Sequence, residues 1–301
     1  TVHFLTPALH YGLGAFEGIR CYNTPKGPAV FRLTDHLQRL LDSIHILGVR
    51  EFPYSLEQLR SAVHETIRAN GFAECYVRPL VYMGNGPLGL NLDASKPLLG
   101  IAVWEWGAYL GEEALEKGIR MMVASFTRPH PNTIMTKAKI SGNYPNSVMA
   151  KTLALRAGFD EAIMLDPQGY VAECTGENLF VVRHGKIYTP YTATVLEGIT
   201  RDTIFAVARD LGYEVLEEPI SRDQLYIADE AFVCGTAAEC IGLSEIDFRT
   251  IGNGKMGPIT RDIQRVYQDL IHGRVPKYEA WCDYVEEKVD SSVFLQVSQS
   301  S

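Results

Sequence analysis

Two lysines stand two positions apart in the segment MTKAKISGNY, residues 135–144. Small and apolar residues flank Lys137 and Lys139, and a surface loop could carry both side chains at little cost. A buried lysine could instead be held neutral and act as a nucleophile towards a carbonyl group. The segment is therefore a candidate catalytic site, and the rest of the chain must decide between the two explanations.

Two turns elsewhere in the chain could bind an anion. In LEGITRDTIFAVARDLG, Gly198, Ile199 and Thr200 precede an amphipathic helical pattern. Thr200 can cap this helix while free backbone N–H groups point outward, which suits a phosphate, although an ordinary capped helix would look the same. The turn CGTAAE, residues 234–239, offers further N–H groups and the Thr236 hydroxyl. Together with a candidate lysine, these turns predict a phosphorylated cofactor.

Two glutamates lie close to a predicted apolar strand in GYVAECTGENLF, residues 169–180. A buried glutamate is costly unless it meets a cation, and a protonated pyridine nitrogen would be such a partner. Of the two, Glu177, which Asn178 follows, is the more structural candidate. For either Glu173 or Glu177 a solvated turn carboxylate is the alternative.

The loop GNGPLG, residues 84–89, has the GxGxxG spacing of dinucleotide-binding proteins and follows a predicted strand. A helix should begin at such a loop, but LNLDASKP follows, with Pro97 and no helical periodicity. We therefore interpret it as a glycine-rich loop without a nucleotide.

Length and charge narrow the class of protein. The chain has 301 residues and a formal net charge of −8. Its length indicates two domains, and its acidic balance argues against nucleic acid as a partner. No apolar run approaches the roughly 20 residues that span a bilayer, so no membrane is expected, and no signal peptide is recognisable. The chain begins at Thr1 without a methionine, so a preceding targeting segment is not excluded.

The cysteines show neither a CxxC pair nor metal-ligand spacing. They are Cys21, Cys75, Cys174, Cys234, Cys240 and Cys282. Most lie in apolar, strand-like contexts, so we expect buried free thiols, no metal site and a reducing compartment. A cytoplasmic location is the default expectation.

Helix and strand signals are mixed along the chain. Helix start and stop signals mark residues 34–48, 55–71 and 257–273. Ser55 and Gln58 form a predicted capping box, and Thr34 is the expected cap of the first segment. Strand-like runs include CYVRPLVYM, LLGIAVWEW, EAIML, NLFVV and EAFVC, and VVRHGKIYT predicts a hairpin that turns at His184 and Gly185.

This mixture lacks the strict alternation of a doubly wound Rossmann unit, so it predicts an α+β or mixed α/β fold. One strand ends in EWGAYLGEEALEKG before another begins in IRMMVASF. We therefore expect a smaller N-terminal α/β domain over residues 1–104, an interdomain loop over 105–116, and a larger C-terminal domain over 117–301 that carries both lysines. The tail after about residue 284 is expected to be peripheral.

Nine motifs resemble those of one family: HYGLGAFEGIRCY, FRLTDHLQRL, YVRPL, WGAYLG, KISGNY, AECTGENLF, LEGITRD, CGTAAE and GKMGPIT. They resemble the branched-chain aminotransferases, in the same order from residue 1 to about residue 284. The resemblance implies the two-domain, D-amino-acid aminotransferase-like architecture of the fold type IV enzymes, with pyridoxal 5'-phosphate as the cofactor. The short strand region that the family has before Thr1 is not in this sequence, and the tail departs from the pattern.

The resemblance also implies roles for individual residues. Lys139, five residues before Tyr144, would hold the cofactor covalently and be the catalytic residue, whereas Lys137 would have no chemical role. Glu173 would pair with the pyridine nitrogen. The implied cofactor-binding residues are Arg39 on the phosphate, Lys139, Tyr144, Glu173, Leu196, Ile199, Thr200 and Thr236. Burial and a nearby cation would lower the pKa of Lys139 below its ordinary value of about 10.4.

A substrate pocket follows from the same resemblance. Its implied residues are Phe16, Tyr76, Arg78, Trp106, Tyr109, Thr236 and Ala237, with the partner subunit's Tyr11 and the partner subunit's Leu90 completing it in a homodimer. Arg78 would bind the side-chain carboxylate of glutamate, because a guanidinium can hold a carboxylate in two hydrogen bonds. The alternative is a structural arginine that pairs with a local acid.

The implied reaction is amino transfer between Leu, Ile or Val and 2-oxoglutarate, as in branched-chain amino acid biosynthesis. The homodimer could be part of a larger homo-oligomer. A D-amino-acid or (R)-amine transaminase, or a lyase, could use the same fold and cofactor. A non-catalytic vitamin-binding protein is a third possibility, but binding alone requires neither Lys139 nor Glu173.

Overall fold

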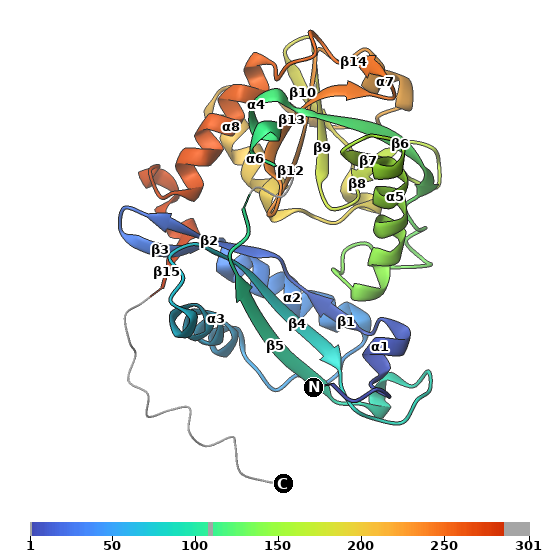
Figure 1. Ribbon diagram of the computed structural model, residues 1–301, viewed down its shortest axis with the longest axis vertical. Helices are drawn as coiled ribbons and strands as arrows, with labels where there is room; N and C mark the ends of the chain where they lie inside the picture. Colours follow the sequence, from blue (N-terminus) through green and yellow to red (C-terminus); the bar gives the residue numbers. More distant parts are fainter. Residues whose placement is uncertain (1, 108–110, 286–301) are drawn as a thin grey trace.

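Two β-sheets, each with its own covering helices, make up the part of the chain that the computed structural model describes, residues 2–107 and 111–285 (Figure 1). The smaller sheet comes mainly from the N-terminal third of the chain, and the larger sheet comes from the rest. The predicted mixed, two-domain architecture is therefore confirmed.

The smaller sheet has six strands in the order β1-β4-β2-β3-β15, with β5 paired to β4, and all its pairings are antiparallel. The strands are β1 (Gly14–Phe16), β2 (Ile19–Thr24), β3 (Gly27–Phe31), β4 (Cys75–Met83), β5 (Pro97–Trp104) and β15 (Cys282–Tyr284), and the helices of this part are α1 (Pro7–Tyr11), α2 (Leu33–Leu47) and α3 (Leu56–Asn70). Leu37 of α2 and Val63 of α3 pack against Ile19 and Val77 of the sheet. This apolar layer holds α2 against the strands that precede it.

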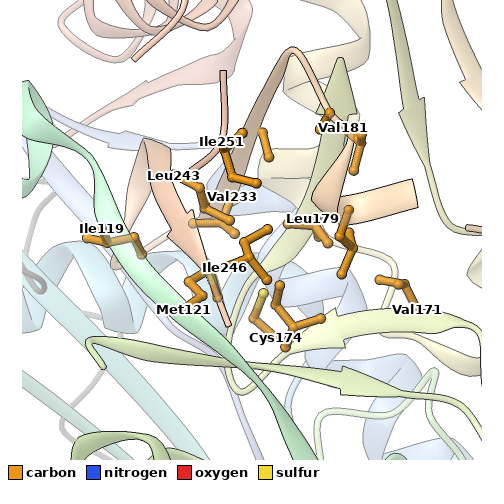
Figure 2. Close-up of a cluster of buried hydrophobic side chains, with 14 of the residues drawn as sticks. Ile119, Met121, Val171, Cys174, Leu179, Val181, Val233, Leu243, Ile246 and Ile251 are labelled. Atoms are coloured by element: carbon orange, nitrogen blue, oxygen red, sulfur yellow. The ribbon is translucent and has the colours of Figure 1, made fainter. Parts of the chain in front are cut away.

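The larger sheet has nine strands in the order β11-β10-β9-β12-β13-β6-β7-β8, with β14 paired to β13. The strands are β6 (Ile119–Thr127), β7 (Glu161–Leu165), β8 (Val171–Cys174), β9 (Asn178–Arg183), β10 (Lys186–Thr189), β11 (Val215–Glu217), β12 (Glu230–Gly235), β13 (Glu239–Ile246) and β14 (Arg249–Thr250). The sheet curls until β8 approaches β9, where the Cys174 N–H donates to the Glu177 carbonyl at 2.8 Å. Figure 2 shows Met121, Leu179, Val233 and Leu243 converging in the core that this curl encloses.

Helices on the outside complete the larger domain. They are α4 (Glu112–Lys117), α5 (Tyr144–Arg156), α6 (Ile199–Asp210), α7 (Arg222–Tyr226) and α8 (Pro258–Ile271). Val207 of α6 and Ile263 of α8 pack with Phe180 and Phe232 of the sheet. On another side Ala150 of α5 packs on β6 and β7. The starts of α5 and α6 are thereby fixed relative to the strand ends.

Several local predictions are confirmed. Ser55 and Gln58 form a reciprocal capping box at the start of α3. The β9–β10 hairpin turns at His184 and Gly185, whose φ angles are 51° and 75°. Residues 84–89 form a loop without a helix, followed by a 3₁₀ turn at Leu92–Ala94. These features depend on neighbours in the sequence, so the sequence could indicate them.

The predicted cap of α2 is wrong. The helix begins at Leu33, and its N-cap is Arg32, with a left-handed φ of 54°, instead of Thr34. The Arg32 guanidinium donates to Asp202 at 2.9 Å and lies 4.5 Å from the Trp281 ring centroid. These contacts come from distant parts of the chain and offset the cost of a left-handed arginine.

The C-terminal strand departs from the predicted domain division. Cys282–Tyr284 pairs with β3 in the smaller sheet, whereas residues 117–301 were expected to form the other domain. Arg60 of α3 donates twice to Asp283, at 2.7 and 2.9 Å, which anchors this strand. The helix α4, Glu112–Lys117, also begins within the interval 105–116 that was expected to be a loop. The remaining boundaries stay a prediction.

All six cysteines are buried and unpaired, as predicted. Within the described residues, none of the helices has the length and apolar character that a membrane span requires.

Candidate active site

A cavity lies where α2, the start of α5, the start of α6 and the ends of β8 and β12 meet. The structure brings together here all the residues that were predicted to bind the cofactor: Arg39, Lys139, Tyr144, Glu173, Leu196, Ile199, Thr200 and Thr236. Their roles stay a prediction, but their convergence on one cavity is an observation.

Lys139 and Tyr144 face each other across a short turn. The 3₁₀ turn Ser141–Asn143 reverses the chain before α5, so Lys139 Nζ donates to Tyr144 Oη at 2.7 Å. The backbone of Lys139 is tied to both neighbouring elements, since its N–H donates to Ser43 Oγ and its carbonyl accepts from the Phe16 N–H, each at 3.0 Å. The lysine is thus held on a rigid segment.

The electrostatics of Lys139 differ from the sequence-based expectation. Burial lowers the pKa of the Lys139 amine, and the Arg39 charge adds to that effect. The Tyr144 hydroxyl and the Glu17 carboxylate raise it, and the net pKa lies above its ordinary value. The expected lowering of the Lys139 pKa is therefore wrong for the groups that surround it, because Tyr144, followed by the distant Glu17, outweighs burial and Arg39.

Glu173 is a buried carboxyl with a polar partner at each oxygen. Its Oε1 lies 2.9 Å from Arg128 Nε, an ion pair in which the N–H is not aligned as a hydrogen bond. Its Oε2 accepts from the Leu196 N–H at 3.2 Å. Burial raises the pKa of Glu173, Arg128 and the Leu196 N–H offset this in part, and the net pKa is raised. Such a carboxyl can share a proton with a nitrogen base.

Arg39 is fixed by a carboxylate that has no exposed surface. Arg39 Nε and Nη2 donate to the two oxygens of Glu17 at 2.7 and 2.8 Å, and Nη1 donates to the Glu197 carbonyl at 2.8 Å. Burial raises the pKa of Glu17, but Arg39 and His36 outweigh it and hold that pKa far below its ordinary value. The bidentate pair orients the guanidinium, whose remaining N–H groups can meet an anion.

The start of α6 differs from its prediction. Gly198 is the N-cap and Thr200 lies inside the first turn, so the expectation that Thr200 caps the helix is wrong. A Cβ at Gly198 would lie 2.0 Å from Asn178 Oδ1, so this approach requires glycine. The first-turn N–H groups, which have no partner within the helix, border the cavity beside Thr236 and suit an anion.

The predicted substrate residues Phe16, Tyr76 and Arg78 lie on β1 and β4 of the smaller sheet. The Phe16 ring centroid is 4.8 Å from that of Tyr144 and 5.2 Å from Lys139 Nζ, so the Phe16 ring faces the lysine. The Arg78 guanidinium carbon lies 4.5 Å from the Phe16 ring centroid. Arg78 Nη2 donates to Tyr76 Oη at 3.2 Å.

Arg78 does not pair with an acid within residues 2–107 and 111–285, and its buried Nε has no hydrogen-bond partner there. The described residues therefore contradict the alternative of a structural arginine held by a local carboxylate. A half-buried cation whose neighbours are aromatic rings and one phenol can accept a substrate carboxylate.

The other predicted substrate residues occupy different settings. The Trp106 ring packs edge-on against Tyr76, with centroids 4.5 Å apart. Ala237 follows Thr236 in the same turn but does not border the cavity. Tyr109 lies outside the described residues. Tyr11 and Leu90 are 40% and 93% exposed and are not among the residues that border this subunit's own cavity.

Three functional candidates were missed in the sequence: Glu17, Arg128 and Asn178. Asn178 Nδ2 donates to the Leu196 carbonyl at 3.2 Å, which joins the two sides of the cavity. Glu17 and Asn178 stand inside the motifs AFEGIR and TGENLF, and this placement was an available signal. Arg128 stands in SFTRPHPN, which carries no such signal, so only the fold reveals its position.

Comparisons with known proteins agree with this site. The model of the amino-transferase class IV family matches residues 14–246. The branched-chain-amino-acid aminotransferase of Pseudomonas aeruginosa is 48% identical over 281 residues, covering 93% of this chain and 91% of the relative. The chain therefore belongs to the class IV aminotransferases, within their branched-chain aminotransferase family.

Solved structures agree as well. The T.th. branched-chain amino acid aminotransferase complexed with N-(5'-phosphopyridoxyl)-L-glutamate superposes with a TM-score of 0.91 at 48% identity, covering 95% of this chain and 94% of that one. The same protein complexed with 4-methylvaleric acid gives a TM-score of 0.90 at 46% identity, with the same coverage.

Proposed function

We propose that this chain is a pyridoxal 5'-phosphate-dependent transaminase that moves amino groups between Leu, Ile or Val and 2-oxoglutarate. Its similarity to branched-chain aminotransferases extends over more than nine-tenths of the chain. The D-amino-acid, (R)-amine and lyase alternatives have no comparable support among these relatives.

The cavity fits the cofactor chemically. Arg39 and the first turn of α6 supply positive partners for the phosphate, and Glu173 supplies a buried carboxyl partner for the pyridine nitrogen. When bound, pyridoxal 5'-phosphate supplies a ring that accepts electrons from the substrate Cα. Lys139 is the residue whose amine can bind the aldehyde of the cofactor covalently.

Lys139 also moves the proton. With the cofactor bound, Lys139 Nζ would be the base that takes up and returns the substrate Cα proton, and Tyr144 Oη, 2.7 Å away, would hold the amine in place. Only the neutral amine can accept that proton. Burial and Arg39 favour the neutral form, whereas Tyr144 and Glu17 oppose it.

The proposed substrate class rests on Arg78 and the aromatic rings around it. The rings around it suit a leucine side chain, and its guanidinium suits the side-chain carboxylate of glutamate. A wholly apolar pocket would exclude glutamate, because desolvating an unpaired carboxylate costs several kcal/mol. The T.th. relative likewise has structures with a glutamate adduct and with a branched apolar acid.

A homodimer completes the proposal, with the partner subunit's Tyr11 and the partner subunit's Leu90 at the substrate pocket. Figure 1 shows α1 beside the loop between β4 and β5. Large apolar side chains are exposed on these elements, including Leu9 at 63% and Leu90 at 93%, which favours burial against a second copy. With six free cysteines, we place the enzyme in the cytoplasm.

An amino-donor screen tests the function. The purified protein should be yellow, and L-leucine and L-glutamate should each change its absorbance as the amino group is transferred. D-alanine and (R)-1-phenylethylamine should leave the spectrum unchanged. A spectrum that responds only to the last two donors would favour the alternative reactions, and a protein that binds no pyridoxal 5'-phosphate would contradict the proposal.

The identity of the catalytic lysine has its own test. Borohydride reduction of the yellow protein should attach the cofactor permanently to Lys139, because its amine borders the cavity and faces Tyr144. Peptide mass spectrometry reads out the modified residue. A label on Lys137 would refute the assignment.

A further inference from the structure

Lys137 has partners that its sequence position did not indicate. Its Nζ donates to the Thr192 carbonyl, lies 3.5 Å from the Val195 carbonyl, and pairs with Glu197 Oε1 at 2.9 Å. All three partners belong to one stretch, residues 192–198, which we call the 192–198 segment. Lys137 therefore connects this segment to the stretch of backbone that carries Lys139.

The 192–198 segment borders the cavity through Leu196 and Gly198. Its other polar contacts go to residues of the cofactor site. The Leu196 N–H donates to Glu173, the Leu196 carbonyl accepts from Asn178, and the Glu197 carbonyl accepts from Arg39. A displacement of the segment would thus disturb the groups expected at the pyridine nitrogen, at the ring face and at the phosphate together.

We propose that Lys137 is a positioning residue that fastens the 192–198 segment to the lysine-bearing segment and thereby sets the non-covalent affinity for the cofactor. The proposal rests on the proposed function, since it presumes pyridoxal 5'-phosphate in this cavity. Lys139 would supply the covalent bond, and Lys137 would keep the cavity wall in place around it.

The contacts to carbonyl groups matter more than the ion pair. The side chains of Lys137 and Glu197 are 38% and 64% exposed, and exposed pairs of this kind contribute little. Hydrogen bonds from a charged donor to buried or half-buried carbonyls are stronger. Removing the amine should therefore weaken the segment's attachment, whereas removing only the Glu197 charge should not.

Comparing the binding of the two forms of the cofactor distinguishes this positioning role from a general structural role. Pyridoxal 5'-phosphate is held partly by its bond to Lys139, which masks weaker non-covalent binding. Pyridoxamine 5'-phosphate has no aldehyde for this bond, so its affinity depends on the cavity wall alone. Loss of Lys137 should therefore weaken binding of the pyridoxamine form most.

The experiment measures dissociation of both forms from the dimeric enzyme by dialysis and absorbance, in wild type and in Lys137→Met. We expect Lys137→Met to bind pyridoxamine 5'-phosphate roughly ten- to hundredfold more weakly, the loss of one or two charge-assisted hydrogen bonds. The same variant should lose pyridoxal 5'-phosphate less readily than it loses the pyridoxamine form. Borohydride should still attach the cofactor to Lys139. Glu197→Gln should stay within about threefold of wild type.

Two further variants complete the design. Lys186→Met removes a lysine of matched exposure, paired with Glu214 at 2.8 Å on another face, and should bind both forms as wild type does. Lys137→Arg keeps a charged donor and should recover part of the affinity, which also provides a measurement if Lys137→Met does not fold.

Equal affinity of Lys137→Met and wild type for the pyridoxamine form would overturn the proposal, as would equal loss of both forms. If Lys137→Arg lost as much affinity for the pyridoxamine form as Lys137→Met, the proposal would also be overturned. That result would show that a charged donor at this position does not determine the affinity. Failure of the proposed function gives a different result, in which wild type itself binds neither form.

Discussion

At the scale of single residues, each reactive side chain owes its properties to a neighbour from a distant part of the chain. Arg39 is oriented by Glu17 across the gap between α2 and β1. Glu173 is held by Arg128, and Lys139 has Tyr144 and Glu17 as its charge neighbours. The predicted site residues supply the functional groups, and these neighbours determine their orientation and protonation.

Glu173→Gln should leave the cofactor bound but slow amino transfer from L-leucine at least about a hundredfold, or about 3 kcal/mol in activation free energy. The amide keeps the shape of the side chain, but it cannot balance a protonated pyridine nitrogen. Stopped-flow absorbance of the half-reaction gives the rate. A variant with the wild-type single-turnover rate would show that Glu173 does not control the ring's protonation.

Arg78→Leu should separate the two substrate classes. Binding of glutamate and 2-oxoglutarate should weaken by roughly 2–5 kcal/mol, the usual cost of truncating one partner of a buried charge pair, while leucine is nearly unaffected. The pair of half-reaction rates with L-leucine and L-glutamate measures this. Equal losses with both donors would make Arg78 a structural residue.

At the scale of elements, the strands β7 to β9 bring the carboxyl groups of Glu161, Glu173 and Glu177 together. Glu161 is fully buried and meets Lys151 Nζ at 2.5 Å and Thr175 Oγ1 at 2.7 Å. Glu177 accepts from the Gly176 N–H at 3.1 Å. Burial, followed by the Glu161 charge, raises the pKa of Glu177 to about 8. The short β8–β9 connection thus places the protonatable carboxyl of Glu177 beside the cavity.

This arrangement predicts how stability depends on pH. An unfolded glutamate has a pKa of about 4.3, so between that pH and about 8 the folded protein binds a proton at Glu177 that the unfolded chain releases. The contribution of Glu177 to stability is therefore present below about pH 4.3 and is lost as pH rises towards 8, by at most about 1.4 kcal/mol per pH unit.

Glu177→Gln should remove this slope. Urea denaturation at several pH values gives the difference in unfolding free energy between variant and wild type. That difference should shift in favour of the variant as the pH rises from 5 to 8, on the scale set by the raised pKa of about 8. A difference that does not change with pH would show that Glu177 titrates normally.

At the scale of the whole molecule, one arginine joins the two sheets next to the substrate residues. Arg20 of β2 pairs with Glu239 of β13 at 3.1 Å and donates to the Trp106 carbonyl at 2.8 Å. Tyr22 Oη also donates to Glu239 at 3.2 Å. Since Glu239 ends the turn that begins at Thr236, these contacts link the smaller sheet to the anion-binding turn of the larger domain.

Arg20→Met should therefore affect both stability and substrate binding. It leaves Glu239, whose side chain is 12% exposed, without its cation, which should cost about 3 kcal/mol of unfolding free energy. The KM for L-leucine should rise because Trp106 and the Thr236 turn lose a common anchor. Arg265→Met, which breaks an exposed pair with Asp262, should cost less than about 1 kcal/mol. Similar losses in both variants would contradict this role.

Features that depend on residues close together in the chain could be predicted from the sequence alone. The Ser55–Gln58 capping box, the turn at His184 and Gly185 and the mixed fold class are of this kind, because local hydrogen bonds and periodicity determine them. The motifs also supplied the residues that converge on the cavity, since their types and order are read directly.

Only the tertiary structure decided the surroundings of those residues. Arg32 stands at the N-cap position of α2 because Asp202 and Trp281 contact its side chain. The pKa of Lys139 lies above its ordinary value because Tyr144 and the distant Glu17 are near. Lys137, which had no assigned role, fastens the 192–198 segment. Charge interactions weaken with distance and with solvent screening, so protonation and orientation follow from which distant segments the fold places side by side.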